Sequence, residues 1–202
     1  IQDIYKNCHR DARHFTRIGK GFIEERGVSF ETALTLLWKE ELIDGFTTML
    51  YPVRNVSGID KGILTQRIAG GKAISPGFKK DALYGQFETY NRTGPLVIVE
   101  GPMDMAHVYQ AGYAVGALMG SSASDQQLAL MGDDVVLFLD NDAAGLKGTI
   151  KIIRQLLLKG VFPSVVSYDD MPLGTDPGEL GVNSIRNLVD NASPVRPSVN
   201  WS

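Results

Sequence analysis

The sequence predicts an α/β protein built on a parallel sheet flanked by helices. Two short apolar runs, Leu96–Val99 and Val135–Leu139, are separated by sequence of helical character. Fully apolar runs of this length are typical of strands buried on both faces of a parallel sheet. Each run ends in acid, because Glu100 follows the first run and Asp140 and Asp142 follow the second.

Residues 93–190 form the expected sheet domain, in which cap residues separate the elements. Gly112 is placed to end a helix over residues 103–111, and Gly160 to end an amphipathic helix over residues 144–159. Ser124 is placed to begin the helix between them. Strands are expected at residues 96–99, 113–118, 134–139 and 164–168. Such alternation indicates a parallel sheet with helices on its faces.

Residues 21–92 predict a smaller α+β subdomain. Its helices are expected over residues 21–44, with Gly27 ending the first and Ser29 capping the second. Leu42 and Ile43 continue the apolar stripe of this helical part.

From Phe46 the apolar period shortens. The pattern predicts strands over residues 49–53 and 62–68, joined by a turn around Asn55–Gly58. Pro52 must then lie at a sheet edge or a bulge, because proline has no backbone N–H. We expect residues 1–20 to be a linker or frayed helix and residues 191–202 to be a tail.

The charge of the chain is unevenly distributed. Its net charge of −3 argues against a nucleic-acid binder. However, residues 1–92 carry 14 Lys and Arg against 11 Asp and Glu, whereas residues 93–202 carry 6 against 12. No apolar run approaches the length of a membrane span, so we expect a cytoplasmic protein with no membrane partner. A single cysteine, Cys8, excludes an internal disulfide and a cysteine-rich zinc site within these residues.

The acids that follow the two apolar runs are candidate metal ligands. The carboxyl ends of parallel strands meet along one edge of a sheet, where ligands bind. Side chains two apart on an extended chain point the same way, so Asp140 and Asp142 can face one ion. Oxygen ligands without His or Cys suit Mg²⁺ or Mn²⁺. Acids at strand ends are also common as solvated caps, and both interpretations stay open at this point.

Three segments resemble the Toprim domain, and in particular the DnaG-type primases of bacteria and phages. They are Val99-Glu100-Gly101-Pro102-Met103-Asp104, Leu118-Met119-Gly120-Ser121-Ser122 and Asp140-Asn141-Asp142-Ala143-Ala144-Gly145. The resemblance covers about residues 20–190. It implies that Glu100, Asp140 and Asp142 are catalytic and hold the metal, with Glu100 as ligand or general base.

The resemblance adds two further acids, Asp104 and Asp176, to the metal site. Asp104 lies in the first turn of a helix, where an acid that only complements the helix dipole is an equal alternative. Asp176 matches the first acid of the family's DPD segment, but Gly178 replaces the second. The candidates that compensate are Glu179, one residue further along, and the pair Asp169 and Asp170.

A basic segment precedes the sheet domain. Its composition alone favours a solvated hairpin, but its order, Lys72 to Ser75-Pro76 to Leu83-Tyr84-Gly85, resembles a segment that DnaG-type primases carry before the Toprim domain. The resemblance implies that basic residues here and in the preceding strand bind nucleotide or template phosphates. These residues are Arg67, Lys72, Lys79 and Lys80.

The resemblance implies a DNA primase catalytic core that joins ribonucleoside triphosphates into short RNA primers on a single-stranded DNA template. The partners it implies are a replicative helicase and a zinc-binding module outside this chain. If the protein is encoded by a phage, its location is the cytoplasm of the bacterial host. The alternatives are a Toprim nuclease and a recombination mediator that binds DNA without chemistry.

Overall fold

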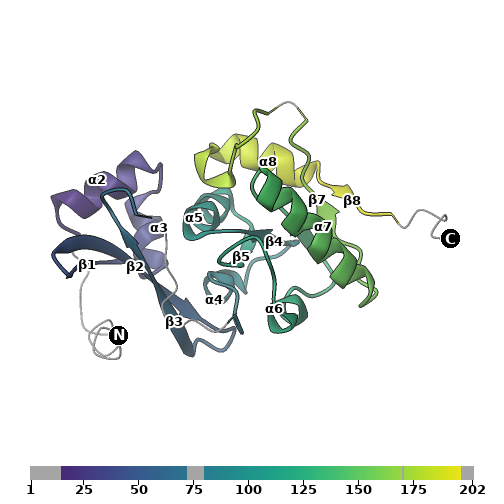
Figure 1. Ribbon diagram of the computed structural model, residues 1–202, viewed down its shortest axis with the longest axis horizontal. Coiled ribbons are helices and arrows are strands. Elements are labelled where there is room, and N and C mark those ends of the chain that lie inside the picture. The colour runs from purple at the N-terminus through teal and green to yellow at the C-terminus, as the bar shows by residue number, and fades with distance from the viewer. Residues whose placement is uncertain (1–14, 72–79, 170, 197–202) are drawn as a thin grey trace.

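The computed structural model describes residues 15–71, 80–169 and 171–196. The N-terminal subdomain, purple to blue in Figure 1, combines helices with a three-stranded antiparallel sheet in the order β1-β2-β3. Its elements are α2 (Arg17–Glu25), α3 (Phe30–Thr35), β1 (Lys39–Ile43), β2 (Phe46–Arg54) and β3 (Asp60–Arg67).

The expectation of helix up to residue 44 is wrong, because residues 39–43 form strand β1. A two-residue turn explains the difference. Asp44 and Gly45 both have positive φ, 51° and 79°, and this pair of conformations connects hairpin strands whose twist matches that of a sheet. The first helix also begins earlier than expected, at Arg17, where the Thr16 hydroxyl caps it.

The two predicted strands after residue 45 are confirmed as β2 and β3. Pro52 occupies a permitted position, because β1 pairs with β2 only as far as Leu50. At Pro52 the sole neighbour among the described strands is β3, and the register shifts directly afterwards, between Val53 and Arg54. The Asn55 side chain accepts hydrogen bonds from two backbone N–H groups and so fixes the predicted turn.

The sheet domain contains the predicted parallel sheet. Four parallel strands and one antiparallel strand pair in the order β5-β4-β6-β7-β8. The strands are β4 (Leu96–Val99), β5 (Ala114–Ala117), β6 (Val135–Leu137), β7 (Ser164–Val165) and β8 (Ser193–Pro194). The helical elements are α4 (Gln86–Thr89), α5 (Pro102–Ala111), α6 (Asp125–Leu130), α7 (Ala143–Leu157), η1 (Pro177–Glu179) and α8 (Val182–Asp190).

Alternating strand residues direct the helices to the two faces of this sheet. Val97 and Val99 of β4 pack in the same apolar cluster as residues of α5, α8 and the N-terminal subdomain. Ile98 packs in a second cluster with residues of α6 and α7. Figure 1 shows α7 lying across the sheet on the side nearest the viewer. The core therefore has two layers, one of which continues into the N-terminal subdomain.

Most predicted boundaries of the sheet domain hold. Gly112 ends α5 with a φ of 103°, and the Ser124 hydroxyl caps α6. Two expectations need correction at the C-terminal side. The strand predicted over residues 164–168 is only two residues long, and residues 193–194 of the expected tail form β8 beside it. Among the described residues, no helix is both long and apolar enough to cross a membrane.

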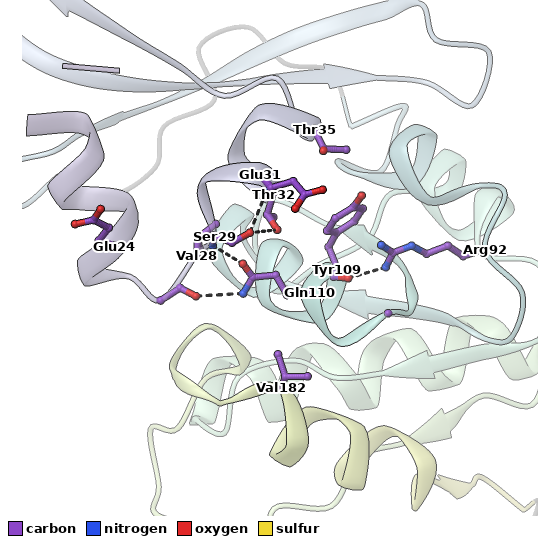
Figure 2. Close-up of a pocket in the computed structure, with 12 residues that line it drawn as sticks. Glu24, Val28, Ser29, Glu31, Thr32, Thr35, Arg92, Tyr109, Gln110 and Val182 are labelled. Carbon is purple, nitrogen blue, oxygen red and sulfur yellow. Dashed lines mark hydrogen bonds between the residues drawn. The ribbon is translucent and has the colours of Figure 1, made fainter. Parts of the chain in front are cut away.

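Side-chain hydrogen bonds join the two parts of the chain. Gln110 of α5 accepts from the Ser29 N–H and donates to the Gly27 carbonyl, as Figure 2 shows for the pocket they line. His107 lies within hydrogen-bonding distance of the Arg26 and Leu180 carbonyls. The pocket has a volume of about 750 Å³ and lies beside the C-terminal half of α5. It is therefore at the opposite end of α5 from Asp104.

Candidate metal centre

Acidic side chains gather where β4 and β6 end. The two strands are parallel neighbours, so Glu100 and Asp140 come side by side, and Glu100 Oε1 lies 3.3 Å from the Asp140 backbone nitrogen that donates to it. Asp142 is exposed and caps α7, because its Oδ1 accepts a hydrogen bond from the Gly145 N–H at 2.7 Å. The strand pairing thus places the three acids at one edge of the sheet.

Glycine at position 145 permits this close packing. A Cβ there would overlap the Asp140 carbonyl and lie 3.0 Å from Glu100 Oε1. The helix that follows the acids therefore begins directly against them.

Burial and mutual repulsion act on these carboxyl groups. Burial raises the pKa of Asp140 to about 7, and the charges of Glu100, Asp176, Asp142 and Glu179 add to the effect. Burial also raises the pKa of Glu100, and Asp142 contributes, although the hydrogen bond from Asp140 opposes the shift. These carboxylates are therefore held together against their own electrostatic repulsion, which is the condition that a divalent cation relieves.

Asp104 connects α5 to the turn that carries Asp176. It is buried, and its two oxygens accept hydrogen bonds from the backbone N–H groups of Gly101 at 2.7 Å and Gly178 at 3.1 Å. A Cβ on residue 178 would lie 2.9 Å from Asp104 Oδ1. Gly178 therefore fits this contact, which accounts for the departure from the family's second acid. Burial, with Asp140 and Asp176 nearby, raises the pKa of Asp104 well above its usual range.

The sequence analysis missed one residue of this edge, Tyr168. Its hydroxyl donates to the Leu139 carbonyl at 2.8 Å, and its ring packs against Phe138. Burial is the main cause that raises the pKa of Tyr168. The charges of four acids raise it further, namely Asp140, Asp104, Asp176 and Glu100. Tyr168 therefore forms one wall of the acidic edge. Its position just beyond the last parallel strand was the available signal.

The donor atoms at this edge fit a hard divalent cation. All are carboxylate oxygens, and the buried Asp140 Oδ1 has no hydrogen-bond partner in the described part of the structure. As the side chains stand, however, no group of three Asp, Glu, His or Cys residues among those described forms a complete metal-binding cluster. Because Asp142 is exposed and Asp140 and Glu100 are half-buried, rotation of these side chains is what binding would require.

The predicted phosphate-binding cations differ in their positions. Lys80 donates a hydrogen bond to the Ser122 carbonyl at 2.8 Å. Burial lowers the pKa of Lys80, and the charge of Glu100 opposes this shift. Arg67 lies at the end of β3 with its guanidinium 4.0 Å from the centre of the Phe46 ring. Among the described contacts, none joins Arg67 to the acids. Lys72 and Lys79 lie outside the described residues.

A cation of the N-terminal subdomain that the sequence analysis overlooked acts electrostatically on the acidic edge. Burial and Glu179 raise the pKa of Asp176, and the charge of Arg26, at the end of α2, opposes this shift. The Arg26 guanidinium itself lies 5.6 Å from the centre of the Phe22 ring. The hydrogen bond between the Arg26 carbonyl and His107 fixes this part of the backbone against α5. Nothing in the local sequence around Arg26 indicates its effect on Asp176, because this effect depends on how the two parts of the chain pack.

The site belongs to the class in which acids lie at the carboxyl ends of adjacent parallel strands. Residues 94–167 match the family model of the Toprim domain. The chain as a whole has the fold of the DnaG-type primase catalytic core, whose solved structure it matches with a TM-score of 0.72 at 19% identity over 88% of this chain and 74% of that one.

Two further comparisons agree. The zinc-binding and RNA polymerase domains of the Aquifex aeolicus primase match with a TM-score of 0.74 at 22% identity, over 89% of this chain and 57% of that one. A DNA primase of Borreliella burgdorferi is 30% identical over 165 residues, which are 72% of this chain and 31% of that protein. The chain thus spans about a third of that relative's length.

Proposed function

We propose that this chain is the catalytic core of a DNA primase, which joins ribonucleoside triphosphates into short RNA primers on single-stranded DNA. The observation that carries the proposal is the pairing of β4 with β6, which sets Glu100 beside Asp140 at the edge of a Toprim domain. The similarity to DNA primases over most of the chain supports the same reaction. We further propose that residues 21–92 and 93–190 act together, the first as a basic part and the second as the metal-holding part.

Nucleotidyl transfer depends mainly on positioning and charge neutralisation. We assign Glu100, Asp140 and Asp142 to hold Mg²⁺ or Mn²⁺, with Asp176 in support. A divalent ion there supplies positive charge to the triphosphate and lowers the pKa of the attacking 3′-hydroxyl. Asp104 holds the turn that carries Asp176, since both its oxygens accept backbone hydrogen bonds.

The cations complete the proposed site. We assign Lys80 to a phosphate of the incoming nucleotide or template. Its ammonium group is held by the Ser122 carbonyl and is close enough to Glu100 for the two charges to interact, so it lies beside the proposed metal site. Arg67, Lys72 and Lys79 are proposed for the same role by resemblance. A zinc-binding module and a replicative helicase outside these residues are the proposed partners. The matched Aquifex structure combines a zinc-binding domain with its RNA polymerase domain.

The test is incorporation of labelled ribonucleotides on single-stranded DNA with Mg²⁺ or Mn²⁺, with a zinc-binding module added in trans. We expect the parent to make primer-length RNA and Asp140→Asn/Asp142→Asn to make none. The matched control is Asp133→Asn/Asp134→Asn, which removes the same charge from exposed positions at the other end of β6. The control should retain full activity.

Other results would reject the proposal in distinguishable ways. DNA cleavage without RNA synthesis would identify a nuclease. DNA binding without either reaction would identify a recombination mediator. RNA synthesis by the Asp140/Asp142 variant would leave the reaction in place but remove the acids from it.

A further inference from the structure

The cations of the sheet domain are concentrated on one helix. Residues 93–202 contain six Lys and Arg. Three of them, Lys147, Lys151 and Arg154, lie on α7, and a fourth, Lys159, follows two residues after its end. The segment 143–160 contains no Asp or Glu, although acids outnumber cations two to one in residues 93–202 as a whole. The helix is thus a basic feature on an acidic domain.

These three cations form an exposed row. All are exposed, and in the described part of the chain none forms an ion pair or donates a side-chain hydrogen bond. Lys147 and Lys151 are four residues apart, and Arg154 is three further on, so the cations are neighbours on one side of the helix. Like charges at this spacing repel one another, although Arg154 lies in the last turn, where the helix dipole favours a cation. A negatively charged ligand would offset the repulsion along the row.

Apolar side chains accompany the row on the same outer face. Leu146 is 62% exposed and Ile150 is 42% exposed. They line a shallow groove of about 550 Å³ together with the three cations. In Figure 1 no described element lies over this face of α7 on the viewer's side.

The row begins at the candidate metal centre. Asp142 caps α7, and the helix rises about 1.5 Å per residue. The three cations therefore lie between roughly 8 and 18 Å from that cap along the helix axis. Lys151 is also close enough to Lys80 for its charge to lower the pKa of Lys80, after burial as the larger cause, while Glu100 acts in the opposite direction. Lys80, which we assign to phosphate binding, thus lies within electrostatic range of the α7 row.

We propose that the outer face of α7 binds the phosphate backbone of the single-stranded nucleic acid that enters or leaves the metal centre. This inference rests on the proposed function, because a template or growing strand must pass the point where its reacting end is held. Lys147, Lys151 and Arg154 neutralise successive phosphates, and Leu146 and Ile150 contact the sugars and bases between them.

A nucleic acid fits this surface better than an acidic protein helix. Both would be attracted to the cations, but only a polymer of phosphates extends naturally from a phosphoryl-transfer site along a row that begins there. Lys80, which we assign to phosphate binding, lies within electrostatic range of the row and points to the same nucleic-acid ligand.

The test is binding of a labelled single-stranded DNA oligonucleotide, followed by fluorescence anisotropy in EDTA over a series of NaCl concentrations. The variant is Lys147→Gln/Lys151→Gln/Arg154→Gln, since glutamine matches Lys and Arg in helix propensity. Each phosphate neutralised on a single strand contributes about 0.7 to the slope of log K against log salt, so we expect the slope to decrease by about 2. The matched control is Arg17→Gln/Lys20→Gln/Arg196→Gln, which removes the same charge from exposed positions outside α7 and outside the proposed site.

The inference is supported if the α7 variant loses affinity at least tenfold at low salt while the control does not. It is overturned if the α7 variant binds like the parent, which would assign the face to a protein partner, or if both variants lose equally, which would indicate net charge alone. Primer synthesis by the parent is measured separately. RNA synthesis with unchanged DNA binding in the variant rejects only the α7 surface, and normal α7-dependent binding without RNA synthesis rejects only the proposed function.

Discussion

At the scale of single residues, the carboxyl groups of the acidic edge lie so close together that each makes ionisation of the others less favourable. Asp140 is the centre of this arrangement, because four other acids raise its pKa in addition to burial. One of its oxygens is buried without a hydrogen-bond partner in the described part of the chain. The loss of stability that the ionised Asp140 carboxylate causes in the absence of a cation can be measured directly.

The metal-free protein should lose stability as the pH rises. Asp140 has an ordinary pKa of 3.8, raised to about 7 by folding, so the folded state holds this proton more tightly than the unfolded state. The stability that this gives is complete below pH 3.8 and is lost as the pH rises through about 7. We therefore expect the thermal midpoint in EDTA to fall between about pH 5 and pH 7, and Asp140→Asn to reduce that fall.

The comparison for this prediction is Asp133→Asn, whose side chain is exposed at the other end of β6. It should show the same pH dependence as the parent. An identical fall in Asp140→Asn would mean that Asp140 does not carry the effect.

Restoring the family's second acid should harm this protein. Gly178→Asp places a Cβ 2.9 Å from Asp104 Oδ1 and 3.1 Å from Asp176 Oδ1. It also adds a negative charge beside these two carboxyl groups, whose pKa values are already raised. We expect a loss of roughly 1 to 3 kcal/mol in the free energy of unfolding, measured with urea in EDTA.

Gly181→Asp is the control for Gly178→Asp. A Cβ there would meet nothing within 4 Å, and the residue caps α8, where aspartate is favourable. The idea fails if the two variants are equally stable.

At the scale of elements, α7 owes its position to two glycines. Gly145 lies against Glu100 and Asp140, and a Cβ at Gly148 would overlap the Ser121 carbonyl. The helix thus packs directly on two loops at the carboxyl edge of the sheet. The placement of the acids and of the basic row depends on this close packing.

Gly148→Ala should therefore destabilise the protein, although alanine is the better helix former. The backbone of Ser121 cannot give way like a flexible side chain, so we expect a loss of about 1 to 3 kcal/mol. In α2, Gly21→Ala meets nothing within 4 Å and should stabilise by up to about 1 kcal/mol. Urea unfolding of both variants measures the difference, and a gain in stability at Gly148 would contradict this packing argument.

The sequence predicted the elements where local chemistry decides them. Ser124 and Gly112 define helix ends through interactions within a few residues, and the apolar run of β4 can only be buried. Residues 39–43 form a strand although Leu42 and Ile43 also fit a helical period, because the turn at Asp44-Gly45 pairs them with β2. The Asp142 cap on α7 was within reach of the sequence, since Gly145 follows it at the capping distance.

The parts of the site that the sequence did not predict depend on tertiary packing. The charge of Arg26 acts on Asp176 because His107 and Gln110 join the loop after α2 to α5. Tyr168 enters it because β7 pairs beside β6. No spacing rule connects residues so distant in the chain.

At the scale of the whole molecule, one apolar cluster spans both parts of the chain. It contains Phe22 and Trp38 from the N-terminal subdomain, Met105 from α5 and Val189 from α8. Trp38 also donates to the buried Tyr84 hydroxyl at 2.7 Å, in the segment that leads into the sheet domain. The two parts share a core rather than a thin interface.

We therefore expect the chain to unfold in one transition. In a Trp201→Phe background, Trp38 fluorescence reports on the N-terminal subdomain, while far-UV circular dichroism reports mainly on the helices of the sheet domain. The two urea midpoints should coincide, and Val189→Ala in α8 should lower both together. Separate midpoints would show that the subdomains are independent.

The pairing of the outermost strands has a consequence for self-association. On one side, the Val115 and Ala117 N–H groups of β5 are already bonded to the Thr89 hydroxyl and the Tyr84 carbonyl. On the other side, β8 covers β7 and ends in Pro194, which has no N–H to offer. An open row of such groups is what recruits strands from other molecules into aggregates. As far as the structure describes them, both margins of this five-stranded sheet are closed to such recruitment, so we expect copies of the protein not to join edge to edge through this sheet.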